Sequence, residues 1–282
     1  MAIVFVHGGV SGVERDRPSL AQAVAAGVAA RSALDAVELA VVVMEDHPAL
    51  NAGFGSVLNR DGRVELDAGL ADGAGGRCGG VAATTVQNPI RLARRVLEDT
   101  PHVLLTGAGA DALGDDMPRI RGTSTAQQQR WEEARAAGRL NLHDYAAPEH
   151  VDTVGAVALG DDGRLAAGSS TGGVFGQLPG RVGDAPIFGA GIYASSAAAV
   201  VGTGVGELFL LSLASARVGR LLEDDAEPQH ACELVVAEMA KRARTSAGLL
   251  ALDHEGRVGA ACRGAAWAVE GPAGVVTPVF VD

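Results

Sequence analysis

The chain has 282 residues, enough to bury a sizeable core as one large domain or two modest ones. Its formal net charge is −11, and no basic stripe is present to neutralise phosphates, which argues against a nucleic-acid partner. No apolar run reaches the roughly 18 residues of a membrane span. The first residues lack the basic segment of a secretion signal, so we expect a cytoplasmic protein with no membrane partner.

The composition also limits what kind of core and site to expect. Aromatic residues make up only 4% of the chain, so the core must consist mainly of Ala, Val and Leu. The seven histidines show no HExxH pattern and no pair at metal spacing, and this argues against a zinc site. The three cysteines form no CxxC pair, and we interpret them as small buried thiols: Cys78, Cys232 and Cys262.

The first 113 residues predict short strands mixed with helices. An apolar run at 3–6 ends in a tight turn, and helical spacing follows over 17–30. Ser32 and Asp35 are typical of a helix start, and Pro48 ends that second helix. After these, the pattern predicts a hairpin turn at 60–63 between strands 57–59 and 64–66, a strand over 79–86, a helix over 89–98, a strand over 103–105 and a helix over 108–113.

The texture changes from about residue 114 to residue 152. This stretch is polar and shows little apolar periodicity, although 123–142 is compatible with a helix. A long segment without a face for the core is unusual inside a compact protein. We therefore predict a mobile or processed connection.

The second half opens with two predicted strands, 154–159 and 164–169, joined by a turn at 160–163. Helices are expected over 207–222 and 229–244. A strand pair over 248–252 and 258–262 and a last strand over 274–281 complete the chain. In each half of the chain, predicted strands are followed by helices and then by strands, without a regular βαβ alternation. This order predicts a layered α/β fold.

Asp152 and Thr153 stand at the head of the first of these strands. A hydroxyl is a weak nucleophile unless a base lies beside it. If the chain were cut between these two residues, the new α-amine of Thr153, which titrates near ~7.7–8.0, would supply that base. A threonine before an apolar run is also an ordinary strand residue, so the pattern alone leaves both interpretations open.

Three further motifs carry polar chemistry. Residues 168–172 match G-x-S-x-G with Ser170 in the nucleophile position, but the glycine-rich stretch that follows cannot be the helix which that motif requires. Arg181 and Asp184 lie in a Pro/Gly-flanked turn, either as a solvated charge pair or as a clamp for a carboxylate and an amine. Residues 202–207 open a helix whose N–H groups suit an oxyanion or a phosphate.

In their order and spacing, these motifs resemble the plant-type (type 2) asparaginases and isoaspartyl aminopeptidases, members of the N-terminal-nucleophile (Ntn) hydrolases. The resemblance covers nearly the whole chain. The motifs that carry it are His7-Gly8-Gly9 and residues 32–38, 51–56, 65–68, 88–90, 100–105, 152–155, 170–173, 179–184 and 202–207.

The resemblance implies a single domain over 1–282, folded as an αββα sandwich with two central, mainly antiparallel sheets. The chain would be a zymogen that cuts itself into an α subunit, 1–152, and a β subunit, 153–282. The pieces would assemble as an (αβ)₂ heterotetramer. The reaction would be hydrolysis of the side-chain amide of L-asparagine or of β-aspartyl peptides through an aspartyl-threonine ester.

The resemblance also assigns catalytic roles. Thr153 would be the nucleophile and Thr171 a hydroxyl partner beside it. Thr203 and the N–H of Gly204 would form the oxyanion hole and contact the substrate. Asn51 would support the site from the α subunit.

Binding roles follow in the same way. Arg181 would hold the α-carboxylate of a small-molecule or short-peptide substrate, and Asp184 its α-amine. No cofactor is implied, but the backbone carbonyls around Met44 to Phe54 resemble the family's structural sodium loop.

The chain departs from the family pattern at residues 10–12, Ala71 and Gly202, and these departures leave the substrate open. One alternative is a glycosylasparaginase-like hydrolase or a relative with another acyl-aspartate substrate. A second is a member that stays uncut and only binds aspartate-like ligands. A third is an uncut α/β-hydrolase that uses Ser170.

Overall fold

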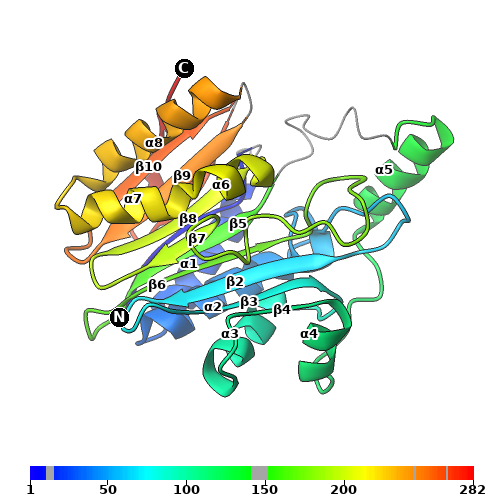
Figure 1. The fold of residues 1–282 in the computed structure, drawn as a ribbon, viewed down its shortest axis with the longest axis horizontal. Coiled ribbons are helices and arrows are strands. Elements are labelled where there is room, and N and C mark those ends of the chain that lie inside the picture. Colours follow the sequence, from blue (N-terminus) through cyan, green and yellow to red (C-terminus); the bar gives the residue numbers. More distant parts are fainter. Residues whose placement is uncertain (11–15, 141–151, 244–245, 265) are drawn as a thin grey trace.

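The computed structural model describes residues 1–10, 16–140, 152–243, 246–264 and 266–282. Four layers are visible in Figure 1, with two facing sheets between two layers of helices. Both sheets are antiparallel except for the pairs β3–β4 and β10–β13. The predicted αββα sandwich with two mainly antiparallel sheets is thereby confirmed.

The larger sheet has eight strands in the order β12-β11-β1-β5-β6-β2-β3-β4. Strands from the two halves of the chain alternate in it, since β1 lies between β11 and β5. The strands are β1 (Ile3–His7), β2 (Leu66–Asp72), β3 (Arg77–Thr84), β4 (Leu104–Thr106), β5 (Val154–Leu159), β6 (Leu165–Thr171), β11 (Val269–Gly271) and β12 (Gly274–Val276).

The smaller sheet has five strands in the order β13-β10-β9-β8-β7, all from the second half of the chain. They are β7 (Ile192–Ala194), β8 (Ala198–Gly204), β9 (Ala247–Asp253), β10 (Val258–Arg263) and β13 (Val279–Phe280).

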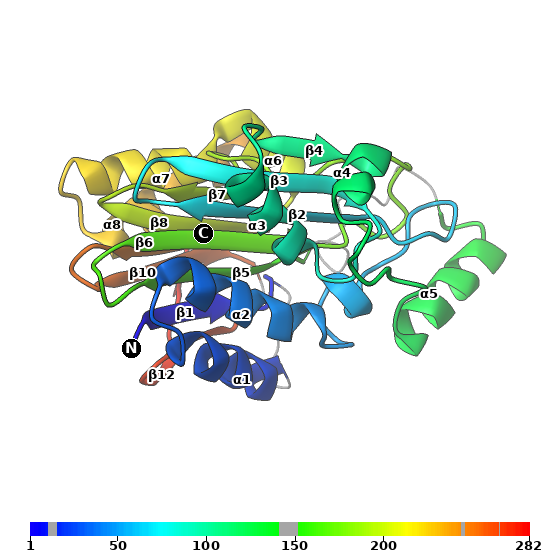
Figure 2. The same cartoon turned by 90° about the horizontal axis from the view of Figure 1, so that it is seen from below.

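Helices cover the outer face of each sheet. Figure 2 shows the layer on the larger sheet, formed by α1 (Arg17–Val28), α2 (Ala33–Glu45) and α3 (Pro89–Asp99). The smaller sheet is covered by α6 (Gly206–Ser212), α7 (Ala214–Glu223) and α8 (Pro228–Arg242). Two further α-helices among the described residues are α4 (Gly107–Leu113) and α5 (Thr125–Ala136).

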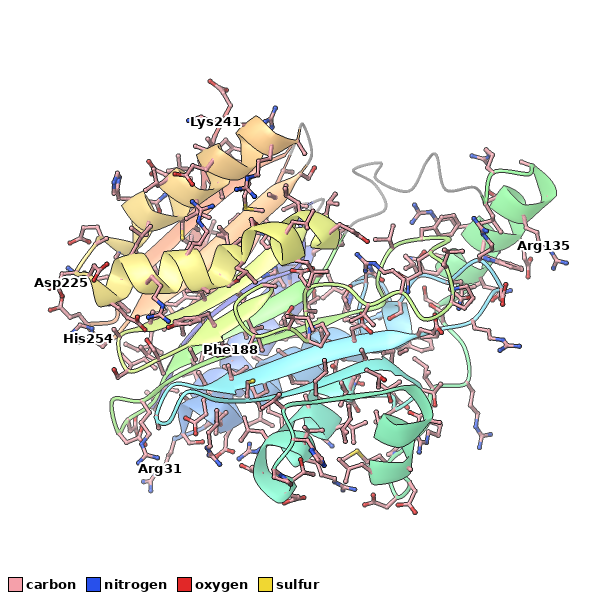
Figure 3. All side chains as sticks on the ribbon, viewed as in Figure 1. Arg31, Arg135, Phe188, Asp225, Lys241 and His254 are labelled. Atoms are coloured by element: carbon pink, nitrogen blue, oxygen red, sulfur yellow. The ribbon has the colours of Figure 1, made fainter. Side chains whose placement is uncertain are left out.

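Three apolar clusters fill the spaces between the four layers, and they consist largely of Ala, Val and Leu, as predicted. Phe188, labelled in Figure 3, packs against both the cluster between the sheets and the cluster under α7 and α8. Cys232 and Cys262 are buried thiols, as expected, whereas Cys78 is only half-buried.

Local sequence signals explain several boundaries. The side chain of Ser32 accepts a hydrogen bond from the Asp35 N–H at 3.1 Å, which is the predicted start of α2. The turn between β5 and β6 closes where the Gly160 N–H donates to the Arg164 carbonyl at 2.9 Å. Gly163 supplies the positive φ of 75° that this turn requires.

Four sequence predictions were wrong in detail. The turn at 60–63 forms, but residues 57–59 are not a strand, and strand β2 runs from Leu66 to Asp72. The helix predicted over 207–222 is broken into α6 and α7 at Leu213, whose φ is 49°. The last predicted strand is divided between β12 and β13, which belong to different sheets. Strands β7, β8 and β11 were not predicted.

The polar segment that begins at residue 114 was predicted to have no face for the core. Its described part, 114–140, does have buried side chains. Figure 1 shows α5 at the rim of the molecule, where it packs through buried Trp131 and Ala134. The Trp131 indole Nε1 donates to the Asn59 carbonyl at 2.9 Å, and the ring covers Gly62. Burial of an indole with its N–H satisfied anchors a helix that is otherwise polar. Residues 141–151 of the predicted connection lie outside the described residues.

Candidate active site

Thr153 lies directly before β5, in the middle of the eight-stranded sheet. Since β5 and β6 pair in register through Val154 and Ser170, Thr171 lies opposite Thr153. On the next strand, Asp67 pairs with Thr171. Three strands from both halves of the chain therefore place polar side chains at one end of this sheet.

Thr153 faces the second sheet. A Cβ on Gly155, two residues further along β5, would lie 3.0 Å from Cγ2 of Val201 in β8. Side chains two residues apart on a strand share a face, so Thr153 and Thr203 lie on the facing sides of the two sheets. Thr153 is 5% exposed and Thr203 is fully buried.

The carbonyl oxygen of Asp152, the residue before Thr153, is held by two donors. Asn51 Nδ2 donates to it at 2.8 Å, and the Thr171 hydroxyl donates to it at 3.0 Å. Asn51 is itself fixed by two further bonds, to the Gly173 carbonyl at 2.8 Å and from the Val57 N–H at 3.0 Å. Two donors on one carbonyl oxygen polarise it and stabilise negative charge that develops there.

The imidazole of His7 lies beside this bond but is a poor base. Complete burial lowers the pKa of His7 from 6.5 to about 3, which the adjacent backbone of Thr153 opposes only in part. Its ring packs against Trp267, with centroids 5.6 Å apart. Burial therefore disfavours the protonated form of His7 and weakens this imidazole as a base for the Thr153 hydroxyl.

Thr203 and Gly204 end β8. The Thr203 hydroxyl is buried and has no hydrogen-bond partner among the described residues, an arrangement that costs free energy unless a ligand completes it. Gly204 has a φ of 138°, and a Cβ there would lie 2.4 Å from the Ser246 carbonyl oxygen, so only glycine fits.

Contacts connect this end of β8 to the polar end of the larger sheet. A Cβ on Gly206 would lie 2.7 Å from Nη2 of Arg181 and 2.8 Å from Oδ1 of Asp184. The loop that carries these two residues is tied to β2, because the Gly183 N–H donates to Asp67 Oδ2 at 2.9 Å. Arg181 and Asp184 thus lie between the two sheets' polar ends.

Three carboxylates, of Asp67, Asp184 and Glu207, lie around the single guanidinium of Arg181. Arg181 pairs with Glu207 through two hydrogen bonds, Nε to Oε1 at 3.1 Å and Nη2 to Oε2 at 3.0 Å. Burial raises the pKa of Asp184 to about 7 and the pKa of Asp67 to about 6, with Arg181 opposing both shifts. Asp184 Oδ2 has no hydrogen-bond partner among the described residues. A cationic group such as an ammonium would complete this site electrostatically.

Sequence reasoning assigned no role to Asp67 or Glu207, although both stand inside motifs that it singled out. Their partners lie far along the chain, with Asp67 and Gly183 separated by 116 residues. Spacing within a motif cannot show such contacts. The available signal was their position inside the motifs 65–68 and 202–207.

Ser170 lies on the other face of β6 from Thr171. It is fully buried, and strand β6 continues through it to Thr171. Gly168, two residues earlier on the same face, lies under α2, since a Cβ there would be 2.5 Å from Cγ1 of Val37. The sharp turn from strand to helix that an α/β-hydrolase nucleophile requires is therefore absent at Ser170.

Glu45, at the end of α2, is a fully buried acid under this strand. Its Oε1 accepts the Ile90 N–H at 3.1 Å, and Ser170 lies beside it. Burial raises the pKa of Glu45 from 4.5 to about 8. The folded protein therefore keeps a proton that the unfolded chain loses, and this contribution to stability disappears as the pH rises through that window.

We expect the variant Glu45→Gln to lose this pH dependence. Relative to the wild type, its free energy of unfolding should rise by about 1.4 kcal/mol per pH unit between pH 5 and 8. Urea unfolding at several pH values measures the difference. Glu133→Gln, at an exposed position on α5, is the control and should follow the wild type at every pH. Parallel curves for Glu45→Gln and the wild type would contradict the assignment.

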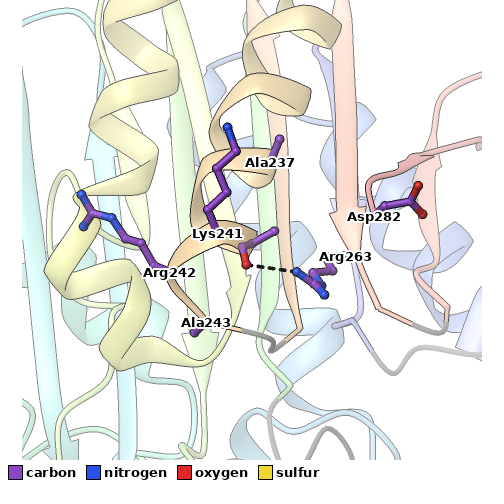
Figure 4. Close-up of a pocket in the computed structure, with 7 residues that line it drawn as sticks. Ala237, Lys241, Arg242, Ala243, Arg263 and Asp282 are labelled. Carbon is purple, nitrogen blue, oxygen red and sulfur yellow. Dashed lines mark hydrogen bonds between the residues drawn. The ribbon is translucent and has the colours of Figure 1, made fainter.

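A separate hollow of about 550 Å³ lies at the carboxyl end of α8 (Figure 4). Lys241, Arg242 and Arg263 line it, and Arg263 Nη1 donates to the Ala240 carbonyl at 3.2 Å. Cations at the carboxyl end of a helix are stabilised by its dipole, which accounts for this basic cluster.

No described helix is long and apolar enough to cross a bilayer.

Two facing sheets covered by helices, with a threonine directly before a central strand, define the layered architecture of the Ntn hydrolases. A family model described as "Asparaginase" matches residues 2–273, so the chain belongs to this family.

Similar proteins span nearly the same length. An isoaspartyl peptidase of Salmonella typhimurium is 41% identical, over 91% of this chain and 90% of its own. A plant-type L-asparaginase of Pyrobaculum calidifontis is 42% identical, over 91% and 92%. An isoaspartyl peptidase/L-asparaginase of Mus musculus is 38% identical, over 90% and 82%.

Proposed function

We propose that the chain cuts itself between Asp152 and Thr153 and then hydrolyses L-asparagine, β-aspartyl peptides or both. The observation that carries the proposal is the pair of donors, Asn51 and Thr171, on the carbonyl oxygen of Asp152. The names of the relatives, isoaspartyl peptidase and L-asparaginase, support the same chemistry.

Self-cleavage begins with the Thr153 hydroxyl oxygen attacking the carbonyl carbon of Asp152. Negative charge develops on the carbonyl oxygen, where Asn51 and Thr171 stabilise it. The C–N bond then breaks, the amine keeps the proton given up by the hydroxyl, and an ester joins Asp152 to Thr153. Water hydrolyses this ester, leaving Thr153 with a free α-amine and a free hydroxyl.

In turnover, the α-amine of Thr153 takes the hydroxyl proton while the hydroxyl oxygen attacks the amide carbon of the substrate side chain. Thr203 and the Gly204 N–H stabilise the oxyanion. The proton passes to the leaving amine, and an aspartyl ester forms. Water hydrolyses the ester and releases aspartate.

The substrate's α-amino acid end would bind between the sheets. Arg181 holds the α-carboxylate, and the buried Asp184 holds the α-ammonium. The unpartnered Oδ2 of Asp184 supports this assignment, because an ammonium donor would satisfy it. An (αβ)₂ assembly and a cytoplasmic location remain parts of the proposal.

The loop between α2 and the short 3₁₀ turn Gly53–Gly55 fits the proposed sodium ion. A Cβ on Gly55 would lie 2.1 Å from the Leu50 carbonyl oxygen and 2.7 Å from the His47 carbonyl oxygen. A Cβ on Gly53 would lie 2.4 Å from the Glu45 carbonyl oxygen. Carbonyl oxygens that gather around two glycines suit a hard cation, which would brace the loop that carries Asn51.

We expect sodium to raise the thermal midpoint of unfolding by a few degrees. A bound ion stabilises the folded state by about 2.7 kcal/mol at a hundred times its dissociation constant. Thermal scans in NaCl and in tetramethylammonium chloride at equal ionic strength would measure the effect, which should saturate. Identical midpoints in the two salts would refute the sodium site.

The substrate is tested by supplying purified protein with L-asparagine, a β-aspartyl dipeptide and a glycan-linked asparagine, and measuring released L-aspartate. Release from the first or second substrate is expected. Release from the glycan-linked substrate alone would favour the glycosylasparaginase alternative. A whole chain that binds aspartate without any turnover would favour the binding-module alternative.

A further inference from the structure

We propose that Glu65 and Asp67 form a two-point clamp that positions the loop carrying Arg181 and Asp184, and so determines how tightly the α-amino acid end of the substrate is recognised. The inference rests on the proposed function of Arg181 and Asp184. It adds two positioning residues, which act through the loop and touch no reacting atom.

The clamp consists of hydrogen bonds from the loop backbone to two carboxylates. The Gly180 N–H donates to both oxygens of Glu65, each at 3.1 Å. The Gly183 N–H donates to Asp67 Oδ2 at 2.9 Å. Asp67 lies on β2 and Glu65 directly precedes this strand, while the two glycines bracket Arg181.

Each carboxylate also accepts a hydrogen bond from a residue outside the loop. Asn59 Nδ2 donates to Glu65 Oε2 at 3.0 Å. The Ala83 N–H donates to Asp67 Oδ1 at 2.9 Å. Ala83 has a φ of 49°, which is uncommon for a residue with a side chain, and the register between β2 and β3 shifts at this point. Such bulges re-aim side chains beside functional sites, and here the bulge directs an N–H at Asp67.

Hydrogen bonds to Glu65 and Asp67 are needed to hold the loop, because the Arg181 side chain itself bonds elsewhere. The guanidinium of Arg181 bonds to Glu207 at the start of α6, next to the five-stranded sheet. A Cβ on Gly183 would lie 2.7 Å from Nη1 of Arg181, so the guanidinium folds back over its own backbone. Glu65 and Asp67 connect that backbone to the eight-stranded sheet, on which Thr153 lies. They thereby fix the distance between the anion-binding group and the nucleophile.

The test uses Glu65→Gln and Asp67→Asn. Each replacement keeps the side-chain size but turns one acceptor oxygen into an NH₂ donor that faces a backbone N–H. Asp72→Asn is the matched control, because Asp72 is a buried carboxylate on the same strand that bonds to Ala74 and Arg77 instead of the loop.

Hydrogen bonds to charged groups have energies that correspond to about a tenfold change in binding or more. We therefore expect both clamp variants to raise the KM for L-asparagine and the Kd for L-aspartate at least tenfold. The extent of self-cleavage should match the wild type, and Asp72→Asn should stay within twofold throughout. The preference for L-asparagine over β-alaninamide, which lacks the α-carboxylate, should fall about tenfold in the clamp variants. General loss of structure would not change that preference selectively.

L-aspartate binding by calorimetry separates this inference from the proposed function. If the wild type binds L-aspartate but hydrolyses neither substrate, the proposed function fails, and the Kd values still test the clamp. If the wild type turns over substrate while both clamp variants keep its Kd, KM and preference within twofold, the clamp is refuted. If the wild type neither binds L-aspartate nor hydrolyses either substrate, both are refuted.

Discussion

The variant Thr153→Ala is expected to remain a single chain of 282 residues and to hydrolyse neither L-asparagine nor a β-aspartyl dipeptide. Removal of the hydroxyl takes away both the group that attacks the Asp152 carbonyl and the nucleophile of turnover. Loss of a nucleophile costs about 10⁶-fold in a comparable hydrolase, so residual activity should be undetectable. The wild type should yield two fragments, 1–152 and 153–282, the second beginning with Thr153. Intact mass and N-terminal sequencing measure both outcomes.

Ser170→Ala is the matched control for this experiment. Ser170 lies one residue from Thr171 but on the opposite face of β6, so its removal should leave cleavage and turnover intact. Cleavage at the same bond in Thr153→Ala would contradict the mechanism. Activity that survives in Thr153→Ala and disappears in Ser170→Ala would restore the serine-hydrolase alternative.

The variant Asn51→Ala is expected to slow self-cleavage by about 10²–10³-fold, the range seen when one oxyanion donor is removed. The Asn51 amide donates to the Asp152 carbonyl oxygen at 2.8 Å, and the Thr171 hydroxyl donates to the same oxygen at 3.0 Å. The loss should therefore deepen in the double variant with Thr171→Val. The fraction of cut chain against time, followed by mass spectrometry, gives the rate.

Since Asn51 also braces Gly173 and Val57, a change in fold has to be distinguished from a change in chemistry. Thr171→Val removes the other donor without touching the Val57 bond, and it should slow cleavage as well. Asn88→Ala, an asparagine at the start of α3, should cleave like the wild type. A wild-type cleavage rate in both Asn51→Ala and Thr171→Val would show that neither donor acts in the reaction.

Much of the layered fold could be predicted, because the strands and helices around Thr153 have clear signals. The strand 154–159 was predicted with its observed bounds, since it is an uninterrupted apolar run. β8 was missed because its sequence, Ala198–Gly204, has only a short apolar run before its glycines and no alternating pattern. The break at Leu213 has no glycine or proline to announce it, although its φ is 49°.

The candidate site shows the same division. The sequence motifs brought forward Thr153, Thr171 and Asn51, and the structure places them around one peptide bond. The motifs did not indicate that Asp67 supports the Arg181 loop, because that contact depends on how β2 and the loop meet in space. Contacts of this kind depend on the register of paired strands, and that register cannot be predicted from one sequence.

The alternation of strands from the two halves within the larger sheet has a consequence for the life of the molecule. If the chain is cut as proposed, β1 of the first fragment lies between β5 and β11 of the second, so neither fragment can leave without breaking the sheet. Unfolding then becomes dissociation into two chains, and refolding becomes a bimolecular reaction that slows on dilution. A denatured mature enzyme should rarely recover, whereas the uncut Thr153→Ala chain should refold as one unit. The working lifetime of the enzyme would thus be governed by its rate of unfolding, and not by an equilibrium.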